Sequence, residues 1–318
     1  MVTGGRPARA ITSGITIGVL LVAIAFAVPG CQPAAWSSGP GSPGPDSPAA
    51  VILHDQAKAV LARWADAVAA AGGGQAVVPV GDLTGQVGDW EPALGDNNKR
   101  ALIAGQVLTD AELSPVAPPD AKVTWADGTT ATVPVLSAQD ALVAIGRSGS
   151  PDACGGCTPL MVTRTTLGSG PIDTTRGAAT GPIWTFAIKG TAVTVTRVAI
   201  GNAVTVPRLE IGPGGTDAMA IDAASGTVGG TALTVSFVGA PLPGNQPCGE
   251  DYFAEAVESN LAVTVIVTRH PFLGPVVACP AVGATRTATA TLAAPLGDRT
   301  VLDLQGGQPV TLTLTLTR

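Results

Sequence analysis

The residues of this 318-residue chain most able to do chemistry are its five cysteines. Cys154 and Cys157 enclose two glycines, and such a C-x-x-C pair serves as a redox couple, as half of a metal site or as a covalently closed turn. A redox couple usually lies at a helix N-terminus or beside cations, whereas here a helix is expected before the motif, a strand after it, and Asp152 is the nearest charge. A zinc site needs two more ligands at short spacing, and Cys248 and Cys279 are too far apart to form a second pair of this kind. We therefore favour a structural disulfide and keep the redox and metal roles as alternatives.

A second candidate for chemistry is a group of four carboxylates, Glu250, Asp251, Glu255 and Glu258. Paired carboxylates act as general acid and base in glycoside hydrolysis. Because side chains alternate along a strand, Asp251 and Glu255 share one face of it and Glu250 and Glu258 share the other. A glycosidase also stacks its sugar on aromatic rings, which are only 3% of this chain. We interpret these residues as solvent-facing charges on a strand and keep a hydrolase as the lesser alternative.

The densest polar stretch of the chain, residues 87–100, is a possible recognition loop. Its candidate residues are Asp89, Trp90, Glu91, Asp96, Asn97 and Asn98. Irregular polar loops that contain an aromatic residue often carry recognition. The structural interpretation, which we favour, is a turn in which Asp96 or Asn97 caps a short helix running through Ile103. The acids do not follow the pattern of a calcium-binding loop.

The remaining sequence offers little for catalysis. Its two histidines are His54, expected on the exposed face of a helix, and His270, expected at a strand end. The common motifs of serine hydrolases and zinc hydrolases and the Walker loop do not occur, and no G-x-G-x-x-G lies between an expected strand and helix. We therefore expect no catalytic residue, no cofactor and no metal, and a binding module in preference to an enzyme.

The first residues indicate export. Residues 1–10 carry two arginines and no acid, residues 15–28 are almost wholly apolar, and Cys31 follows closely. A basic start, a short apolar run and a small residue before the cut form a secretory signal. Residues 28–31 resemble a bacterial lipobox, which implies diacylglycerol on Cys31, removal of residues 1–30 and attachment to the outer face of the cell membrane. The alternatives are an uncleaved anchor helix and an ordinary signal with an incidental cysteine, and both also place the chain outside the cytoplasm.

Cysteine number agrees with an oxidising compartment. If Cys31 carries lipid, four cysteines remain, and of their three possible pairings we favour Cys154–Cys157 with Cys248–Cys279. In the chain-entropy model the longer loop stabilises by about 3–4 kcal/mol and the shorter by about 2 kcal/mol. Residues 31–48, rich in Gly, Pro and Ser, form a tether that cannot pack.

The composition and net charge of the chain limit the classes of partner that it can bind. The chain has 17 basic and 23 acidic residues, a net charge of −6. Nucleic-acid binding needs clustered Lys and Arg, so we expect no nucleic-acid partner. We expect attachment to the membrane through the lipid, with another envelope protein or a small ligand as partner.

The elements that must position these residues are mainly strands. We expect a mainly β fold of antiparallel sandwich-like or barrel-like domains, with an N-terminal amphipathic helix and one or two short helices. The helix begins at Ser47-Pro48 and ends at Gly72, with Leu53, Ala57, Val60, Leu61, Trp64 and Val68 on one face. Asp127-Gly128 predicts a hairpin turn, and Ser137 caps a helix over 138–146. Residues 49–211 are expected to form a helix plus strand-rich domain with the C-x-x-C pair, and residues 212–318 an all-β domain.

The expected strands fall in both of these regions. In the first region they are 76–80, 122–126, 129–136, 160–166, 183–188, 191–200 and 203–209. In the second they are 218–222, 232–238, 252–258, 262–268, 285–292, 300–304 and 310–317.

Several segments carry a family resemblance. They are 83–91, 95–98, 154–160, 248–252 and 295–303. With these segments the chain resembles uncharacterised actinobacterial cell-envelope lipoproteins. The resemblance implies an envelope location and assigns no activity and no functional residue.

Overall fold

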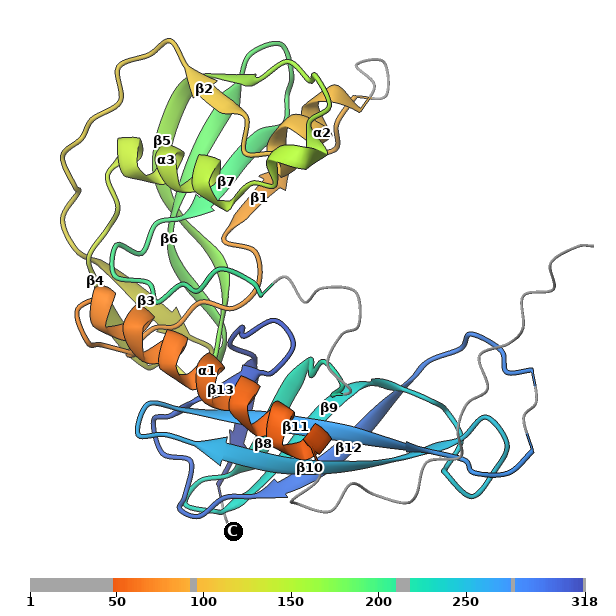
Figure 1. Ribbon diagram of the computed structural model, residues 1–318. Helices are drawn as coiled ribbons and strands as arrows, with labels where there is room; N and C mark the ends of the chain where they lie inside the picture. Colours follow the sequence, from red (N-terminus) through yellow and green to blue (C-terminus); the bar gives the residue numbers. More distant parts are fainter. Residues whose placement is uncertain (1–47, 92–95, 210–217, 276–277, 317–318) are drawn as a thin grey trace, which may run out of the picture. The chain divides into compact units, whose positions relative to one another are not determined.

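The computed structural model describes residues 48–91, 96–209, 218–275 and 278–316, all within one compact unit, Pro40–Arg318 (Figure 1). The expected signal segment, Cys31 and most of the tether lie outside these residues, as does the expected helix cap Ser47. Among the described helices, none is both long enough and apolar enough to span a bilayer.

A long hairpin organises the first part of the unit. Strands β5 (Leu160–Thr174) and β6 (Gly177–Ile188) pair antiparallel over almost their whole length. β2 joins β5, while β3 and β7 join β6, so that the described strands of this sheet number seven. The others are β1 (Thr84–Val87), β2 (Val107–Thr109), β3 (Ala121–Trp125), β4 (Thr130–Val133) and β7 (Thr194–Val198).

Local sequence rules hold in this sheet. The turn between β3 and β4 is the predicted one: Gly128 has φ of +82°, and the Thr129 N–H donates to Asp127 Oδ1 at 2.8 Å. Helix α3 (Ala138–Ser148) begins after Ser137, whose Oγ accepts from the Asp140 N–H at 3.0 Å. Both predictions are confirmed, because each depends only on residues next to one another in the chain.

The C-terminal strands form two sheets, with the orders β10-β11-β13 and β12-β9-β8-β14. Their bounds are β8 (Ala223–Thr227), β9 (Ala232–Gly239), β10 (Glu250–Glu258), β11 (Ala262–Pro271), β12 (Ala284–Thr291), β13 (Thr300–Asp303) and β14 (Thr311–Thr315). The mainly β prediction is confirmed. The expectation of antiparallel pairing is wrong at β2–β5, β11–β13 and β8–β14, which are parallel. Parallel strand partners need long crossover connections, and no local sequence pattern predicts which strands will pair in this way.

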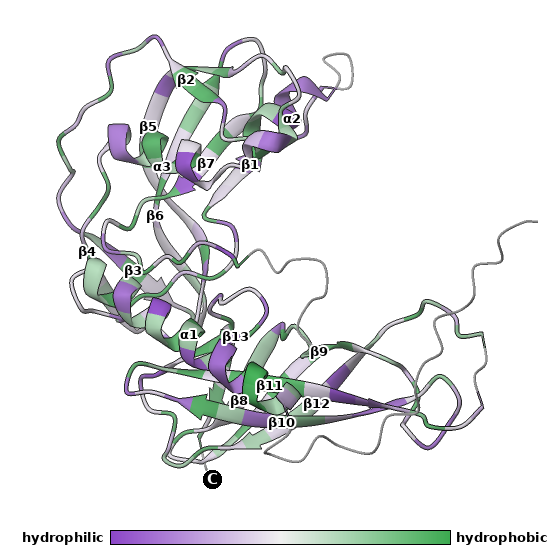
Figure 2. Cartoon of the chain, viewed as in Figure 1, coloured by the Kyte–Doolittle hydropathy of each residue, from purple (hydrophilic) through white to green (hydrophobic). Residues whose placement is uncertain are grey.

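β11 is the central strand of the C-terminal core. Val263, Val265 and Val267 pack with residues of β8, β9 and β12, while Ala262 and Ile266 pack on the opposite side of β11. Figure 2 shows the apolar character of this strand. A strand that is buried on both faces has a continuous apolar sequence.

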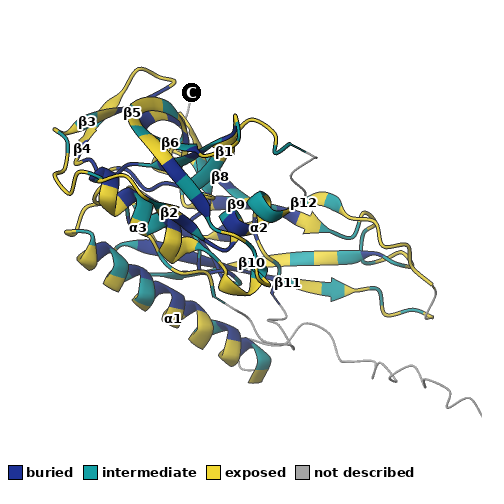
Figure 3. Ribbon diagram, turned by 90° about the horizontal axis from the view of Figure 1, so that it is seen from above, coloured by how far each residue is buried: buried dark blue, intermediate teal, exposed yellow. Residues whose placement is uncertain are grey.

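Helix α1 (Pro48–Ala70) covers the second side of β11. All the residues predicted for its apolar face are buried, and Figure 3 shows this buried stripe on one side of the helix with exposed residues opposite. Leu53 and Trp64 belong to the same cluster as Ala262, Ile266 and Leu302. The helix therefore packs on strands from the C-terminal region, although the predicted domain 49–211 includes it. The division near residue 211 lies in the undescribed segment 210–217 and stays a prediction.

Three predicted strands are wrong: residues 76–80, 203–209 and 218–222 form no strand. The first and last contribute only isolated bridges, at Pro79 and Ala218. Residues 203–209 bury Val204 beside α1 and place the Pro207 carbonyl where Arg63 Nη2 donates to it at 2.8 Å. The apolar residues of these segments are therefore buried against the helix and the strands of the core, without forming a hydrogen-bonded ladder of their own.

Candidate functional site

The C-x-x-C loop is a disulfide-closed turn on the surface of the first sheet. Cys154 and Cys157 are bonded, and Cys248 is bonded to Cys279, which is the pairing we favoured. The loop follows a short 3₁₀ turn, η2 (Pro151–Ala153), and precedes β5. Both cysteines are half-buried, and the glycines between them are exposed. The bonded pair therefore faces solvent along its glycine edge.

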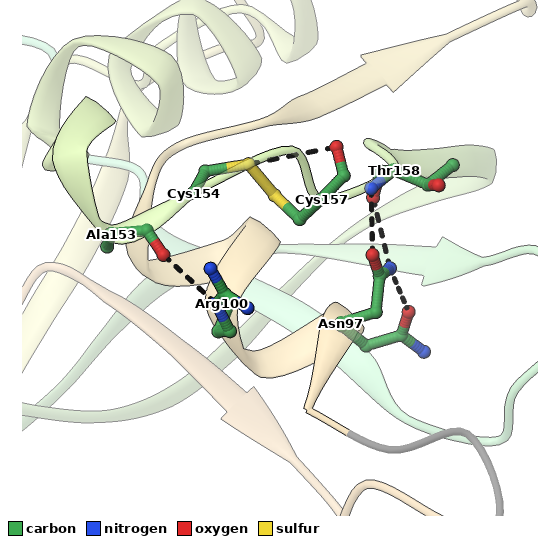
Figure 4. Close-up of a disulfide and its surroundings, with 7 residues drawn as sticks. Asn97, Arg100, Ala153, Cys154, Cys157 and Thr158 are labelled. Atoms are coloured by element: carbon green, nitrogen blue, oxygen red, sulfur yellow. Dashed lines mark hydrogen bonds between the residues drawn. A yellow bond between two sulfur atoms is a disulfide. The ribbon is translucent and has the colours of Figure 1, made fainter.

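Helix α2 (Asn97–Ile103) holds both ends of this loop, as Figure 4 shows. Asn97 Oδ1 accepts from the Thr158 N–H at 2.7 Å, and Asn97 Nδ2 donates to the Thr158 carbonyl at 3.1 Å. Arg100 Nε donates to the Ala153 carbonyl at 3.3 Å. Asp96 makes no side-chain capping bond. The predicted helix is confirmed, whereas its expected side-chain cap is wrong, because Asn97 contacts the disulfide loop instead.

Arg100 is the cation that the sequence did not reveal. A Cβ placed on Gly155 would lie 3.1 Å from Arg100 Nη2, so the guanidinium lies directly against the loop. A nearby cation favours the thiolate form of a reduced cysteine. The loop also follows the end of a 3₁₀ turn, so that no helix N-terminus adds to this effect. The arrangement suits a structural staple and also permits a reducible pair.

The polar loop before α2 uses much of its chemistry internally. The Glu91 carboxylate accepts from the Thr191 hydroxyl at 2.7 Å and from the Ala192 N–H at 3.1 Å. The Thr191 hydrogen bond, followed by backbone N–H groups, lowers the pKa of Glu91 below its ordinary value. Trp90 packs against the core beneath α2 and α3. Its Nε1 is buried and has no hydrogen-bond partner within the described residues. Of the predicted recognition residues, Asp89 and Asp96 remain exposed.

The four carboxylates of β10 lie on the two faces expected from alternation. Asp251 accepts from the Gly244 N–H, and Glu255 lies 3.1 Å from His54 Nε2. Glu250 accepts from the Tyr252 hydroxyl, and Glu258 pairs with Arg299 at 2.6 Å. Each carboxylate thus has a structural contact.

The spacing along β10 also bears on the hydrolase alternative. Residues four apart on one face of a strand are separated by about 13 Å. Glycosidase carboxyl pairs stand roughly 5–9.5 Å apart. Asp251 and Glu255 therefore do not have the spacing of an acid–base pair, nor do Glu250 and Glu258, which are twice as many residues apart.

The two histidines are not brought together. His54 was expected to be solvated, and it is partly exposed at 36% while facing Glu255 across the interface of α1 and β10. His270 packs edge-on against Phe253, with ring centroids 4.7 Å apart.

Arg197 is a second residue that sequence reasoning missed. It lies on β7 and is only 8% exposed. Its Nη1 donates to Thr84 Oγ1 at 2.9 Å, while its buried Nε has no partner in the described part of the chain. No carboxylate pairs with it among those residues, and burial lowers the pKa of its guanidinium. Alternation along β7 places Arg197 beside buried Val195, but nothing in the sequence marks it as buried and unpaired.

The site carries no known signature. No family model, no curated protein and no solved structure matches the chain. In the described ranges, no three His, Cys, Asp or Glu side chains gather in a way that could hold a metal ion. The likeness to actinobacterial lipoproteins stays a prediction.

Proposed function

We propose that this chain is a lipid-anchored extracytoplasmic binding protein. The observation that carries the proposal is the cysteine pairing. The two disulfides use four of the five cysteines, and the one left over is Cys31, at the end of the signal-like segment. Disulfides form and persist outside the cytoplasm, and a lipobox cysteine is acylated there.

The contacts of the polar side chains favour binding over hydrolysis. The carboxylates of β10 hold structural partners and do not have the separation of a hydrolytic pair.

Acylation is the direct test of this proposal. Cells grown with an alkyne fatty acid should label the wild-type chain, and Cys31→Ser should lose the label. The matched control is the double variant Cys154→Ala with Cys157→Ala, which should keep it. Membrane fractionation gives a second readout. If Cys31→Ser is labelled as strongly as the wild type, or if it pellets with membrane at the mature size, the lipid assignment is wrong.

A second candidate function is thiol–disulfide exchange at Cys154 and Cys157, and the position of Arg100 favours it. In such a reaction the disulfide takes two electrons and two protons from a partner dithiol, which becomes a disulfide. Equilibration with dithiothreitol buffers measures the potential. A redox-active pair should titrate above about −270 mV, and a structural bond below roughly −300 mV. Arg100→Gln should make the potential of a redox-active pair more negative, because it removes the charge that favours the thiolate.

A further inference from the structure

Two neighbouring loops at one end of the C-terminal strands lack charge altogether. The first loop, residues 240–249, joins β9 to β10, and the second, 272–283, joins β11 to β12. Neither contains Asp, Glu, Lys, Arg or His. We call residues 240–249, 272–275 and 278–283 the uncharged tip; it lies beyond the ends of β9 to β12 (Figure 1).

Covalent and backbone bonds make the tip one surface. Cys248 of the first loop is bonded to Cys279 of the second, and the Phe272 N–H donates to the Gly249 carbonyl at 2.9 Å. The Glu250 N–H donates to the Leu242 carbonyl at 3.0 Å. A stapled surface loses little conformational entropy when it binds, which favours association.

Large apolar side chains project from this surface into water. Leu273 is 70% exposed, Val282 is 60% exposed and Leu242 is 40% exposed. Just behind the tip, Val238 is 59% exposed and Phe253 is 57% exposed. Exposed loops are normally polar, and a concentration of exposed apolar side chains marks an interaction site or a membrane contact.

Helix α1 begins toward the same end of these strands. His54, near its start, lies 3.1 Å from Glu255. Farther along the helix, Trp64 Nε1 donates to Gln75 Oε1, which also accepts from Thr300. Thr300 pairs with Ala262 at the start of β11, the end of that strand away from the tip. The helix therefore runs away from the tip, and its first described residue, Pro48, lies toward the tip end of these strands.

We propose that the uncharged tip inserts into the interfacial region of the lipid bilayer. The inference rests on the proposed lipid anchor, which would bring this end of the strands to the membrane. Moving a charged side chain into an apolar phase costs free energy, and the tip contains no charged residue. The chain as a whole is net negative, so anionic headgroups would not attract it. Charged residues do bond to the tip from the strands behind it: Asp251 of β10 accepts from the Gly244 N–H, and Arg286 of β12 donates to the Ala240 and Pro241 carbonyls.

The test uses the compact unit Pro40–Arg318, which contains every described core cluster and lacks Cys31. The unit is sedimented with neutral phosphatidylcholine vesicles, and its partition coefficient is measured. Leu273→Asp should lower that coefficient at least tenfold. The matched control is Val116→Asp, because Val116 is 73% exposed but lies outside the tip. The control should partition within twofold of the wild type.

Three results would overturn the proposal. The first is that the wild-type unit does not partition into vesicles, and the second is that Leu273→Asp partitions as well as Val116→Asp. The third is that Leu273→Asp converts a dimer to a monomer in sedimentation, which would make the tip a contact between copies. Thermal unfolding of each variant confirms that it is folded. Failure here leaves the acylation result at Cys31 untouched, so that the anchor and the tip are judged separately.

Discussion

Arg299 donates to the Glu258 carboxylate at 2.6 Å across 41 residues of sequence, and both side chains are mostly buried. Arg299 also donates to the backbone carbonyls of Ala294, Pro295 and Leu296. Glu258 accepts in addition from the Ala293 N–H at 2.7 Å. The pair thus fixes the loop before β13 to the end of β10.

Acid should weaken this connection. Burial raises the pKa of Glu258, but the Ala293 N–H and then Arg299 outweigh burial and hold the pKa below its ordinary value. A lowered folded-state pKa gives stability above the unfolded pKa, roughly 4.3, that is lost as the pH falls through the folded value. We expect Glu258→Gln to lower the free energy of unfolding by about 1–3 kcal/mol near neutral pH. The deficit should shrink toward zero in acid.

Urea denaturation across the pH range measures this effect. Glu112→Gln is the control, because Glu112 is exposed and makes no ion pair within the described residues. A deficit for Glu258→Gln that stays constant from neutral pH into acid would contradict the sign argued here.

Arg197, which is buried, and Arg299, whose side chain is mostly buried, should respond differently to loss of charge. Arg197 has no carboxylate partner in the described part of the chain, whereas Arg299 has one. Removing one member of a buried ion pair costs about 3–5 kcal/mol, while replacing a costly buried charge by an apolar side chain is often neutral or stabilising. We expect Arg299→Met to be strongly destabilising and Arg197→Met to change the free energy of unfolding by less than about 1 kcal/mol or to raise it. Equal losses in urea denaturation would show that Arg197 is compensated in some other way.

The disulfides should differ in their contribution to stability. Cys248–Cys279 spans 31 residues and Cys154–Cys157 spans 3. In the chain-entropy model, closing the longer loop stabilises by about 3–4 kcal/mol and closing the shorter one by about 2 kcal/mol. Alanine at both cysteines of each pair, measured separately by thermal and urea unfolding, should therefore cost more for Cys248–Cys279. The reverse order would show that the C-x-x-C loop stabilises far more than its length implies.

What the sequence predicted well is local. The turn at Asp127-Gly128, the cap at Ser137 and the buried face of α1 each depend on neighbouring residues or on one helical period. The long-range parts were missed. α1 packs on β11, about 200 residues later, and β13 and β14 pair parallel to β11 and β8. Apolar periodicity shows that a face is buried, but it does not identify what covers that face.

The residues of the candidate site divide in the same way, into those that the sequence identifies and those that only the fold brings to the site. The cysteines could be identified from residue type alone, because few other residue types have the chemistry of a thiol. Arg100 and Asn97 were not placed beside the loop, since more than 50 residues separate each from its contact there. Arg197 was missed because an arginine in a strand of alternating pattern is normally exposed.

The packing of α1 on β11 gives the last prediction. Leu53 is 4% exposed and belongs to the cluster shared with Ile266 and Leu302, whereas Ile52, its neighbour in sequence, is 57% exposed. Truncating a buried leucine leaves a cavity and costs about 2–5 kcal/mol, while an exposed apolar side chain contributes within about 0.5 kcal/mol. Leu53→Ala should therefore shift the urea midpoint strongly and Ile52→Ala hardly at all. Because the cluster contains residues of β11 and β13, loss of Leu53 should also increase hydrogen exchange at the amides of these strands. Unchanged exchange in β11 would show that the helix and the C-terminal sheets do not share a core.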